Sequence, residues 1–513
     1  MKFKSKKQIT IKIFVVFLLG IFLMSLAGFG SYDENVARQN FESLPPSATK
    51  QLILDTLGRQ NVSGAAAAII SGYSVTTYMV SLTTNIDSKI TEDSFFYIAS
   101  LSKAFTALGV QLLEYFGYIN FDDSITKYFP NLFFRYRDND FDSSEITIHN
   151  LLFHTSGLDN VRHSGRIDPS NEYNALEVAV NSLNNTRLLF RPGSKYNYAS
   201  VNYIILGRII EIVSGMSFTN FMHQNIFTQL NLFETTTCRY VASQLGVVVQ
   251  GRRPSWFLSR PNEITASKTH TPTGFMLSTL SDLVRWTQLQ LNPENAPYPL
   301  DILIKNQHTP DMSVVPHNAY FHYGYGWHIN PSSGRIRHPG AGPNVVSEIL
   351  IYRETSAAVV VWMNCSGGRA INLAENLLAI SRNEPVGEIV RGSTTKMLDT
   401  LFSSLSIVFI IITTVLIALN TLVIFSKIKD DRKLVSPSKK SVIIIGLLAL
   451  IIIILAFLVT FAPSILSLPS WYVLTNIWAP LSLVTLLIFI CTSLFFTAIL
   501  ITIKLLFRKK GNN

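Results

Sequence analysis

One pair of side chains in this sequence has the residue types and the spacing that nucleophilic catalysis needs. Ser100 and Lys103 lie three residues apart in FFYIASLSKAFTALGV, and on a helix this spacing places both side chains on one face. A serine hydroxyl is a poor nucleophile unless a neighbouring group accepts its proton, which a desolvated lysine amine can do. At a helix start, unpaired backbone N–H groups would also stabilise a developing oxyanion. The pair therefore indicates acyl transfer.

The Ser-x-x-Lys spacing alone is a weak signal, because it recurs elsewhere in the chain. It also begins at residues 47, 124, 393, 426 and 436. Only the pair at 100 and 103 lies between a β-type apolar run and a strongly apolar helical pattern over 104–116. Further elements in a fixed order are needed to support the chemistry.

Two later segments supply groups that acyl transfer also requires. Tyr198, in RPGSKYNYAS, follows a turn and precedes a helical pattern, and a phenol near cationic groups can relay a proton to a leaving group. Farther along, RHPGAGPN places His338 and Gly340 before an apolar strand. Gly340 would let a backbone edge approach a substrate closely, and the Ala341 N–H could complete an oxyanion hole with that of Ser100. A phosphate-binding loop is excluded here, because no third glycine follows at the required spacing.

The apolar patterns around these residues predict a sheet with helices. Runs typical of strands cover 65–70, 73–81 and 347–363. Apolar residues recur at helical spacing over 104–116, 201–213 and 370–381. Because strands occur at both ends of the region 44–383 with helices between them, we expect an antiparallel sheet whose first and last segments meet, plus a helical insertion.

The order Ser-x-x-Lys, Tyr-x-Ser, His-x-Gly resembles that of the serine β-lactamase and penicillin-binding protein superfamily, in its class C β-lactamase-like branch. Further landmarks that look the same are ITIHNLLFHTSGL (146–158), PGSKYNYAS (192–200), PTGFMLSTLSDLVRW (272–286) and YGYGWHI (323–329). The resemblance covers nearly all of 44–383. It implies an α/β fold in which helices sandwich an antiparallel sheet, with an all-helical lobe beside it and a cleft between them.

Carried over residue by residue, the resemblance implies roles for the candidate site. Ser100 would be the acylated nucleophile, Lys103 its proton acceptor or electrostatic partner, and Tyr198 a general base and acid. The residues expected to bind substrate or complete the oxyanion hole are Ser200, His338, Gly340 and Ala341. Two of these depart from the family pattern: Ser200 stands where Asn is commoner, and His338 stands where β-lactamases carry Lys. The loss of that fixed positive charge argues against an efficient β-lactamase and leaves esterase, D-amino-acid amidase and peptidase activities open.

Apolar stretches without charge predict membrane attachment at the C-terminal end. Three transmembrane helices are expected, at 404–425, 441–461 and 480–503, after a stalk at 386–403. The basic loop 426–440 and the tail 504–513 are expected in the cytoplasm by the positive-inside rule. Residues 1–30 combine a lysine-rich start with a short apolar run, which fits either a cleaved signal peptide or a signal anchor. The domain 31–385 is then expected outside the cytoplasm, on a multi-pass protein of the cell membrane.

Composition excludes several other classes of protein. With 48% hydrophobic and 15% charged residues among 513, the chain has ample apolar surface to bury, so disorder is excluded. The chain has a formal net charge of +10, and three short segments beside the apolar runs (2–12, 426–440 and 504–510) together carry more positive charge than this. Basic residues in such places set the orientation of a protein in the membrane, so the charge argues against a nucleic-acid partner.

Cysteines and histidines give no further site. Three cysteines cannot form a disulfide framework, although Cys238 and Cys365 could pair in an oxidising compartment. His149 and His154 lie five residues apart and do not share a helical face, so we interpret both as structural. No metal and no organic cofactor is expected.

Together these features predict a membrane-anchored extracytoplasmic serine hydrolase. It would act by acyl-enzyme transfer on small peptide, amide or ester substrates, cell-wall peptides among them, as a carboxypeptidase, D-aminopeptidase or esterase. Two alternatives stay open on the same scaffold: a penicillin-recognising sensor in which Ser100 is acylated without turnover, and a non-catalytic binding domain.

Overall fold

A computed structural model describes most of the chain in two compact units. The described residues are 46–82, 89–136, 139–141, 143–160, 172–264, 267–315, 321–390, 392–429, 433–434, 437–450, 454 and 479–508. One unit contains residues 37–254 and 258–396, and the other contains Ser255–Phe257 and 397–513 together with residues 1–36. The N-terminal segment 1–30, predicted as a signal peptide or anchor, lies outside the described residues.

The larger unit is built on a seven-stranded sheet in which every pairing is antiparallel. In spatial order its strands are β11 (His322–Tyr323), β12 (His328–Asn330), β13 (Arg335–Ala341), β14 (Val346–Tyr352), β15 (Ala357–Met363), β1 (Gly64–Ser71) and β2 (Ser74–Ser81). Strand β1 pairs with β15, so the prediction that the first and last strands of the domain meet is confirmed.

The first hairpin shows how the sequence sets this register. Gly72 has a φ of +57°, a left-handed conformation that glycine adopts without strain, and the two-residue turn pairs Ser71 with Ser74. Strand β1 reads GAAAAIIS and is buried on both faces. Its alternate residues pack into two different clusters, so small side chains suit a strand with layers above and below it.

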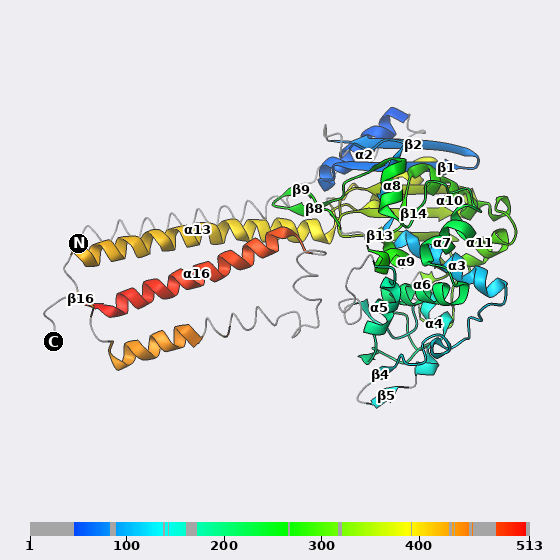
Figure 1. Ribbon diagram of the computed structural model, residues 1–513. Helices are drawn as coiled ribbons and strands as arrows, with labels where there is room; N and C mark the ends of the chain where they lie inside the picture. The colour runs from blue at the N-terminus through cyan, green and yellow to red at the C-terminus, as the bar shows by residue number, and fades with distance from the viewer. Residues whose placement is uncertain are drawn as a thin grey trace. The chain divides into compact units, whose positions relative to one another are not determined.

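Helices cover both faces of the sheet (Figure 1). Helices α2 (Pro46–Gln60) and α12 (Ala370–Ser381) pack on one face. The larger cluster on the other face includes α3 (Ser102–Tyr115), α6 (Ser200–Ser214) and α10 (Leu280–Leu291). Helix α3 is buried continuously from Ser102 to Leu113, which explains why most of its residues are apolar. The helices predicted at 104–116, 201–213 and 370–381 are therefore confirmed, within one or two residues at each end.

Shorter elements complete this unit. The remaining helices are α4 (Ile148–Leu152), α5 (Ala175–Ser182), α7 (Phe218–Met222), α8 (Arg239–Leu245), α9 (Thr271–Gly274) and α11 (Leu300–Gln307). The remaining strands are β3 (Ser94–Tyr97), β4 (Phe134–Tyr136), β5 (Asn139–Phe141), β6 (Thr186–Arg187), β7 (Val247–Val248), β8 (Arg252–Ser255), β9 (Leu258–Pro261) and β10 (Leu277–Ser278). Cys238 and Cys365 are both free thiols, so the possible disulfide between them is not formed.

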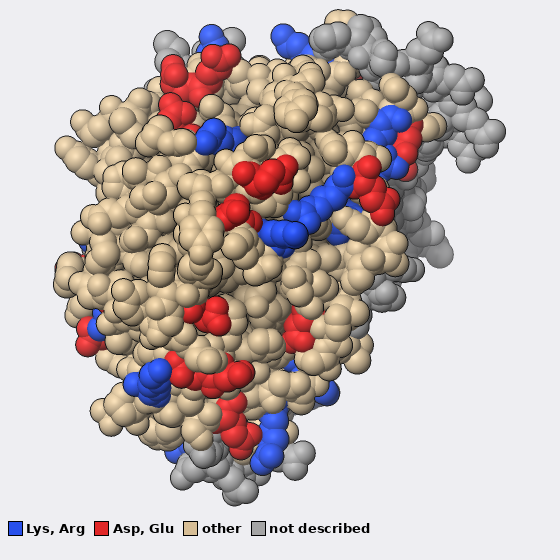
Figure 2. Space-filling view, turned by 90° about the vertical axis from the view of Figure 1, so that its right-hand side faces the viewer, with Lys and Arg blue, Asp and Glu red and all other residues tan. Residues whose placement is uncertain are grey.

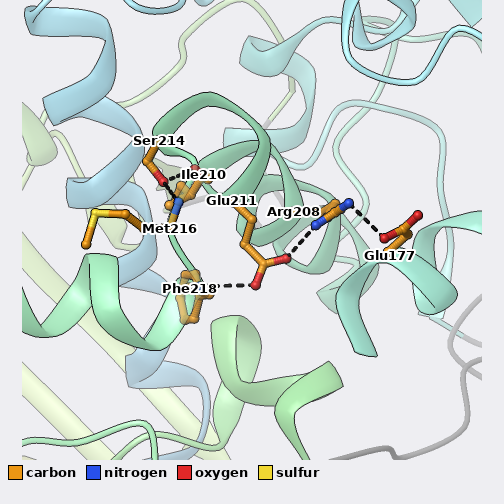
Figure 3. Close-up of polar contacts among 7 residues, drawn as sticks. All are labelled: Glu177, Arg208, Ile210, Glu211, Ser214, Met216 and Phe218. Carbon is orange, nitrogen blue, oxygen red and sulfur yellow. Dashed lines mark hydrogen bonds and ion pairs between the residues drawn. The ribbon is translucent and has the colours of Figure 1, made fainter. Parts of the chain in front are cut away.

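Helix α6, whose first turn follows Tyr198, is fixed at its other end by polar contacts (Figure 3). The Arg208 guanidinium pairs with Glu211 in the next turn and with Glu177 on α5, at 3.0 and 2.9 Å. The second oxygen of Glu211 accepts the N–H of Phe218 at the start of α7. These contacts tie three consecutive helices, α5, α6 and α7, together.

The second unit contains two helices that are long and apolar enough to cross a membrane. They are α13 (Thr394–Lys429) and α16 (Leu481–Leu506). The described residues therefore contain two candidate spans where the sequence predicts three. Of the third predicted span, 441–461, only residues 441–450 and 454 are described, all of them helical, and the rest lies outside the described residues. Helix α13 also begins at Thr394, within the segment predicted as a stalk.

The buried residues of α13 are all polar, whereas its exposed residues are mostly apolar, as suits a helix in lipid. The Thr413 and Ser493 hydroxyls share a hydrogen bond of 2.6 Å between α13 and α16, and Asn420 donates to the Phe496 carbonyl at 3.0 Å. Near the start of α13, the buried Asp399 carboxylate accepts the Ser482 hydroxyl at 2.6 Å. In a membrane, where no hydrophobic effect draws helices together, contacts of this kind can pair them.

Charges on the larger unit are mixed. On the face shown in Figure 2, Lys and Arg side chains lie beside Asp and Glu side chains, and most of the surface is uncharged. This distribution agrees with the location of the excess basic residues in the short segments identified above.

Candidate active site

Ser100 lies in a single 3₁₀ turn, Ala99–Leu101, that leads directly into α3. Ala99 has a φ of +49°, which is rare for a residue with a Cβ and is found where the surrounding structure enforces it. Two hydroxyls hold the turn: Ser102 Oγ donates to the Ala99 carbonyl, and Ser347 Oγ donates to the Ile98 carbonyl, both at 2.8 Å. The turn is thus held from its own helix and from strand β14.

Lys103 is completely buried beneath this serine. Its Nζ lies 3.2 Å from Ser100 Oγ and donates a hydrogen bond of 2.7 Å to the carbonyl of Thr273. Burial lowers the pKa of Lys103 from 10.5 to about 7. Since no charge is among the causes of this shift, the amine is depleted of its proton by desolvation alone, and near neutral pH a substantial fraction can accept one.

Tyr198 lies on the other side of the lysine. Lys103 Nζ is 5.0 Å from the centroid of the Tyr198 ring. Burial raises the pKa of the phenol, and the nearby Ser100 hydroxyl counteracts part of that rise. Among the described residues the Tyr198 hydroxyl has no partner that satisfies both the distance and the angle of a hydrogen bond. The phenol is therefore protonated at neutral pH and is a proton donor at rest.

The imidazole of His338 is buried beside these groups on β13. Its Nδ1 is 2.8 Å from the Pro339 carbonyl and its Nε2 is 3.2 Å from the Tyr323 hydroxyl. A carbonyl only accepts hydrogen bonds, so Nδ1 must carry the ring proton, and Nε2 accepts a hydrogen bond from the Tyr323 hydroxyl. Burial, with smaller contributions from His328 and Lys103, lowers the pKa of His338 well below its ordinary value. The ring is neutral, so it supplies no fixed positive charge.

Gly340 lies where β13 packs against the turn that carries Ser100. A Cβ at this position would lie 1.9 Å from Ser347 Oγ, 2.8 Å from the Ile98 carbonyl oxygen and 3.1 Å from Ala99 Cβ. The absent side chain therefore lets β13 pack against the turn that carries Ser100.

Ala341 is exposed at the end of β13. Strand β12 pairs with β13 only from Arg335 to Arg337. On that side, the edge at 338–341 consequently has no ladder partner among the described strands. An unpaired edge next to the nucleophile turn is suitable for main-chain hydrogen bonds to a substrate.

Ser200 is the first residue of α6 and is half-buried. Its backbone N–H donates to Asn160 Oδ1 at 2.6 Å. In the described part of the chain its hydroxyl makes no hydrogen bond to Ser100 or Lys103, so the structure brings together Ser100, Lys103 and Tyr198 but does not add the Ser200 hydroxyl to them.

Three site residues were missed by reasoning from the sequence. The sequence predicts a structural role for His154, but the centroid of its ring lies 4.4 Å from that of the Tyr198 ring. Asn160 binds the backbone on both sides of Ala199, at the Tyr198 carbonyl and the Ser200 N–H. Thr273 contributes the carbonyl that binds Lys103. Both His154 and Thr273 lie within the landmarks 146–158 and 272–286, which was the only signal that could have indicated them.

Comparison with known proteins identifies the family. A family model described as Beta-lactamase matches residues 49–382. The chain belongs to the beta-lactamase family. The resemblance seen in the sequence is confirmed, and with it the β-lactamase-like α/β fold and a place among β-lactamase and penicillin-binding-protein-like serine hydrolases.

Relatives of this family member differ in how much of the chain they share. Protein flp of Staphylococcus aureus (strain NCTC 8325 / PS 47) is 27% identical over 82% of this chain and 83% of its own length. Penicillin-binding protein 4* of Bacillus subtilis (strain 168) is 29% identical over 53% of this chain and 61% of its own.

Two solved structures show the same fold. The octameric penicillin-binding protein homologue from Pyrococcus abyssi has a TM-score of 0.58 at 21% identity, covering 70% of this chain and 81% of its own. A class C beta lactamase has a TM-score of 0.53 at 16% identity, covering 66% of this chain and 96% of its own.

Proposed function

We propose that this protein is a serine hydrolase that works through an acyl-enzyme on Ser100. The observation that carries the proposal is the buried Lys103 amine, 3.2 Å from Ser100 Oγ, with a pKa of about 7. An amine that is partly neutral at physiological pH can take the hydroxyl proton as the serine attacks a carbonyl. An ordinary exposed lysine could not, because it would already be protonated.

In the proposed cycle, Ser100 Oγ bonds to the substrate carbonyl carbon while its proton moves to Lys103 Nζ. The backbone N–H groups of Ser100 and Ala341 stabilise the oxyanion. The tetrahedral intermediate then collapses and expels the leaving group, which takes the Tyr198 phenol proton, and Lys103 returns its proton to the phenolate. Water repeats the same steps on the acyl-enzyme and releases the acid. The raised pKa of the phenol supports its part as the proton donor.

We assign small esters, amides and peptides as the substrates, cell-wall peptides among them. The neutral His338 supports this breadth, since no fixed cation at that position selects for a carboxylate. The same feature argues against efficient hydrolysis of β-lactams, whose carboxylate a lysine would bind.

Labelling of the full-length chain with a fluorophosphonate and with a fluorescent penicillin tests the proposal. Wild type should be labelled and should hydrolyse p-nitrophenyl acetate, whereas Ser100→Ala should do neither. Ser124→Ala is the matched control, because Ser124 begins another Ser-x-x-Lys but its lysine is exposed and paired with Asp123.

Each outcome of the labelling has a distinct meaning. Labelling that persists in Ser100→Ala would refute Ser100 as the nucleophile. A penicillin label that stays for hours without ester turnover would identify a sensor in place of a hydrolase. No label on wild type would identify a non-catalytic binding domain.

We further propose that the larger unit faces the exterior and that α13 and α16 anchor it in the membrane. The hydropathy and length of both helices support anchoring, and the basic residues at 426–440 support a cytoplasmic position for that segment. In sealed vesicles of cytoplasmic-side-in orientation, trypsin added outside should leave this segment intact and should cut it after permeabilisation. Cleavage before permeabilisation would reverse the topology.

A further inference from the structure

The phenol of Tyr198 needs an accurate position, yet its own hydroxyl does not supply it. Among the described residues this hydroxyl has no hydrogen-bond partner of good geometry. Helix α6 starts only at Ser200, so Tyr198 belongs to the irregular segment before it. The position of the phenol must therefore come from the backbone around Tyr198 and from packing against its ring.

His154 contacts the backbone on both sides of Tyr198. The His154 carbonyl accepts the N–H of Asn197 at 2.8 Å. Its Nδ1 accepts the N–H of Ala199 at 3.3 Å. One residue thus binds the residue before and the residue after the tyrosine, once through its main chain and once through its side chain.

The imidazole is also fixed in its own orientation. It is fully buried, and the side-chain amide of Asn202 on α6 donates to the same Nδ1 at 2.9 Å. Two donors on Nδ1 require that this nitrogen carry no proton, so the ring is the neutral Nε2–H tautomer. The centroids of the His154 and Tyr198 rings are 4.4 Å apart, and the Tyr323 ring lies 4.6 Å away on another element.

A φ of +58° at His154 makes both contacts possible. In this left-handed conformation the carbonyl and the side chain can both reach the 197–199 segment, whereas continuation of α4 as a helix would carry them apart. Such a conformation is strained for a residue with a Cβ, although Asn and His tolerate it better than most. Its occurrence here indicates that the surrounding contacts enforce it.

We propose that His154 is a positioning residue for the Tyr198 phenol, holding it beside Ser100 and Lys103 in the state that donates a proton to the leaving group. The inference rests on the proposed function and adds to it a residue that does not touch the reacting atoms. Asn160 supports the same segment, since its side chain binds the Tyr198 carbonyl at 3.2 Å and the Ser200 N–H at 2.6 Å.

Two substitutions at this position separate the acceptor from the ring. His154→Asn keeps an acceptor at the same distance along the side chain and tolerates the positive φ, whereas His154→Ala removes the acceptor. We expect His154→Ala to lower kcat by about 10- to 100-fold, the effect of a displacement of about 1 Å in a catalytic group. His154→Asn should recover most of that loss, and KM should change little in either variant.

A comparison of two esters with different leaving groups distinguishes positioning of the phenol from a merely structural role of His154. p-Nitrophenolate leaves as an anion, whereas ethoxide must be protonated as it leaves. With the full-length protein, His154→Ala should therefore slow hydrolysis of ethyl acetate more than that of p-nitrophenyl acetate. His308→Ala is the control: His308 is paired with Gln290 and packs on Trp327, outside the site, and its substitution should not alter this ratio.

A double-mutant cycle with Tyr198→Phe completes the test. If His154 acts through the phenol, His154→Ala should have no further effect on kcat in the Tyr198→Phe protein. An equal fractional loss in both backgrounds, or an equal loss for both esters, would overturn the inference while leaving the hydrolase proposal intact. A wild type without turnover would instead refute the proposed function and this inference with it.

Discussion

Replacement of Lys103 by methionine should make the protein inactive and, below about pH 9, more stable. The reason is that the folded state keeps this lysine completely buried, where its pKa falls from 10.5 to about 7. Each pKa unit corresponds to about 1.4 kcal/mol, so the folded state loses about 5 kcal/mol at pH 7 and below by burying this side chain. Methionine fills a similar volume without that cost.

The sign of the pH dependence follows from the protons bound in each state. Between pH 7 and 10.5 the unfolded chain keeps the Lys103 proton while the folded chain releases it. Wild-type stability should therefore rise with pH across this window, and the full penalty should be present below it. Methionine removes the penalty but leaves the Thr273 carbonyl without its donor, which costs about 2 kcal/mol. The free energies of unfolding of the two proteins should then cross near about pH 9.

Urea unfolding in mild detergent, followed by tryptophan fluorescence at pH 6.5, 8 and 10, measures this difference. Lys305→Met on α11 is the control, because Lys305 is exposed and its substitution should have the same effect at every pH. A Lys103→Met protein that is less stable than wild type at pH 6.5, with a difference independent of pH, would refute the reasoning. It would mean that Lys103 stays charged, and the amine could then not accept the serine proton.

Three further predictions concern the strand beside the site. Gly340→Ala should lower esterase activity by at least about tenfold and the free energy of unfolding by about 1–3 kcal/mol, because the new Cβ would overlap Ser347. An ester-hydrolysis rate checks the first effect and a thermal melt checks the second. Arg337→Ala should lower the free energy of unfolding in urea by about 3 kcal/mol, because the buried Glu348 carboxylate loses the two hydrogen bonds that Arg337 donates. The double variant Arg337→Ala, Glu348→Leu should recover most of this loss. His338→Lys should raise kcat/KM for carboxylate-bearing esters relative to neutral ones, and an unchanged ratio would reject a charge-selecting role for this position.

Much of the fold could be predicted from local patterns. The mostly apolar α3 and the β-type run from 347 to 363, which forms β14 and β15, appear in the structure close to the predicted bounds. These elements are set by periodicity and turn chemistry, which are properties of neighbouring residues. The order of motifs is also a property of the sequence, so the family could be predicted from Ser-x-x-Lys, Tyr-x-Ser and His-x-Gly together with the landmarks between them.

The arrangement around the lysine could not be predicted in this way. The Thr273 carbonyl lies 170 residues from Lys103 along the chain, and the His154 ring lies 44 residues from Tyr198. Gly340 likewise lies beside Ile98 and Ala99, which are more than 200 residues earlier in the chain. None of these pairs has a sequence spacing that would bring it together, since each depends on how α3, α9 and β13 pack.

The sequence by itself determined which groups are available for chemistry and which segments are apolar enough for a core or a membrane. Only the tertiary structure decided their protonation. A lysine amine and a phenol have ordinary pKa values in an unfolded chain, and enclosure by packed helices and strands removes the water that stabilises their charged forms. Since that enclosure comes from segments distant in the chain, the reactivity of Ser100 is a property of the fold.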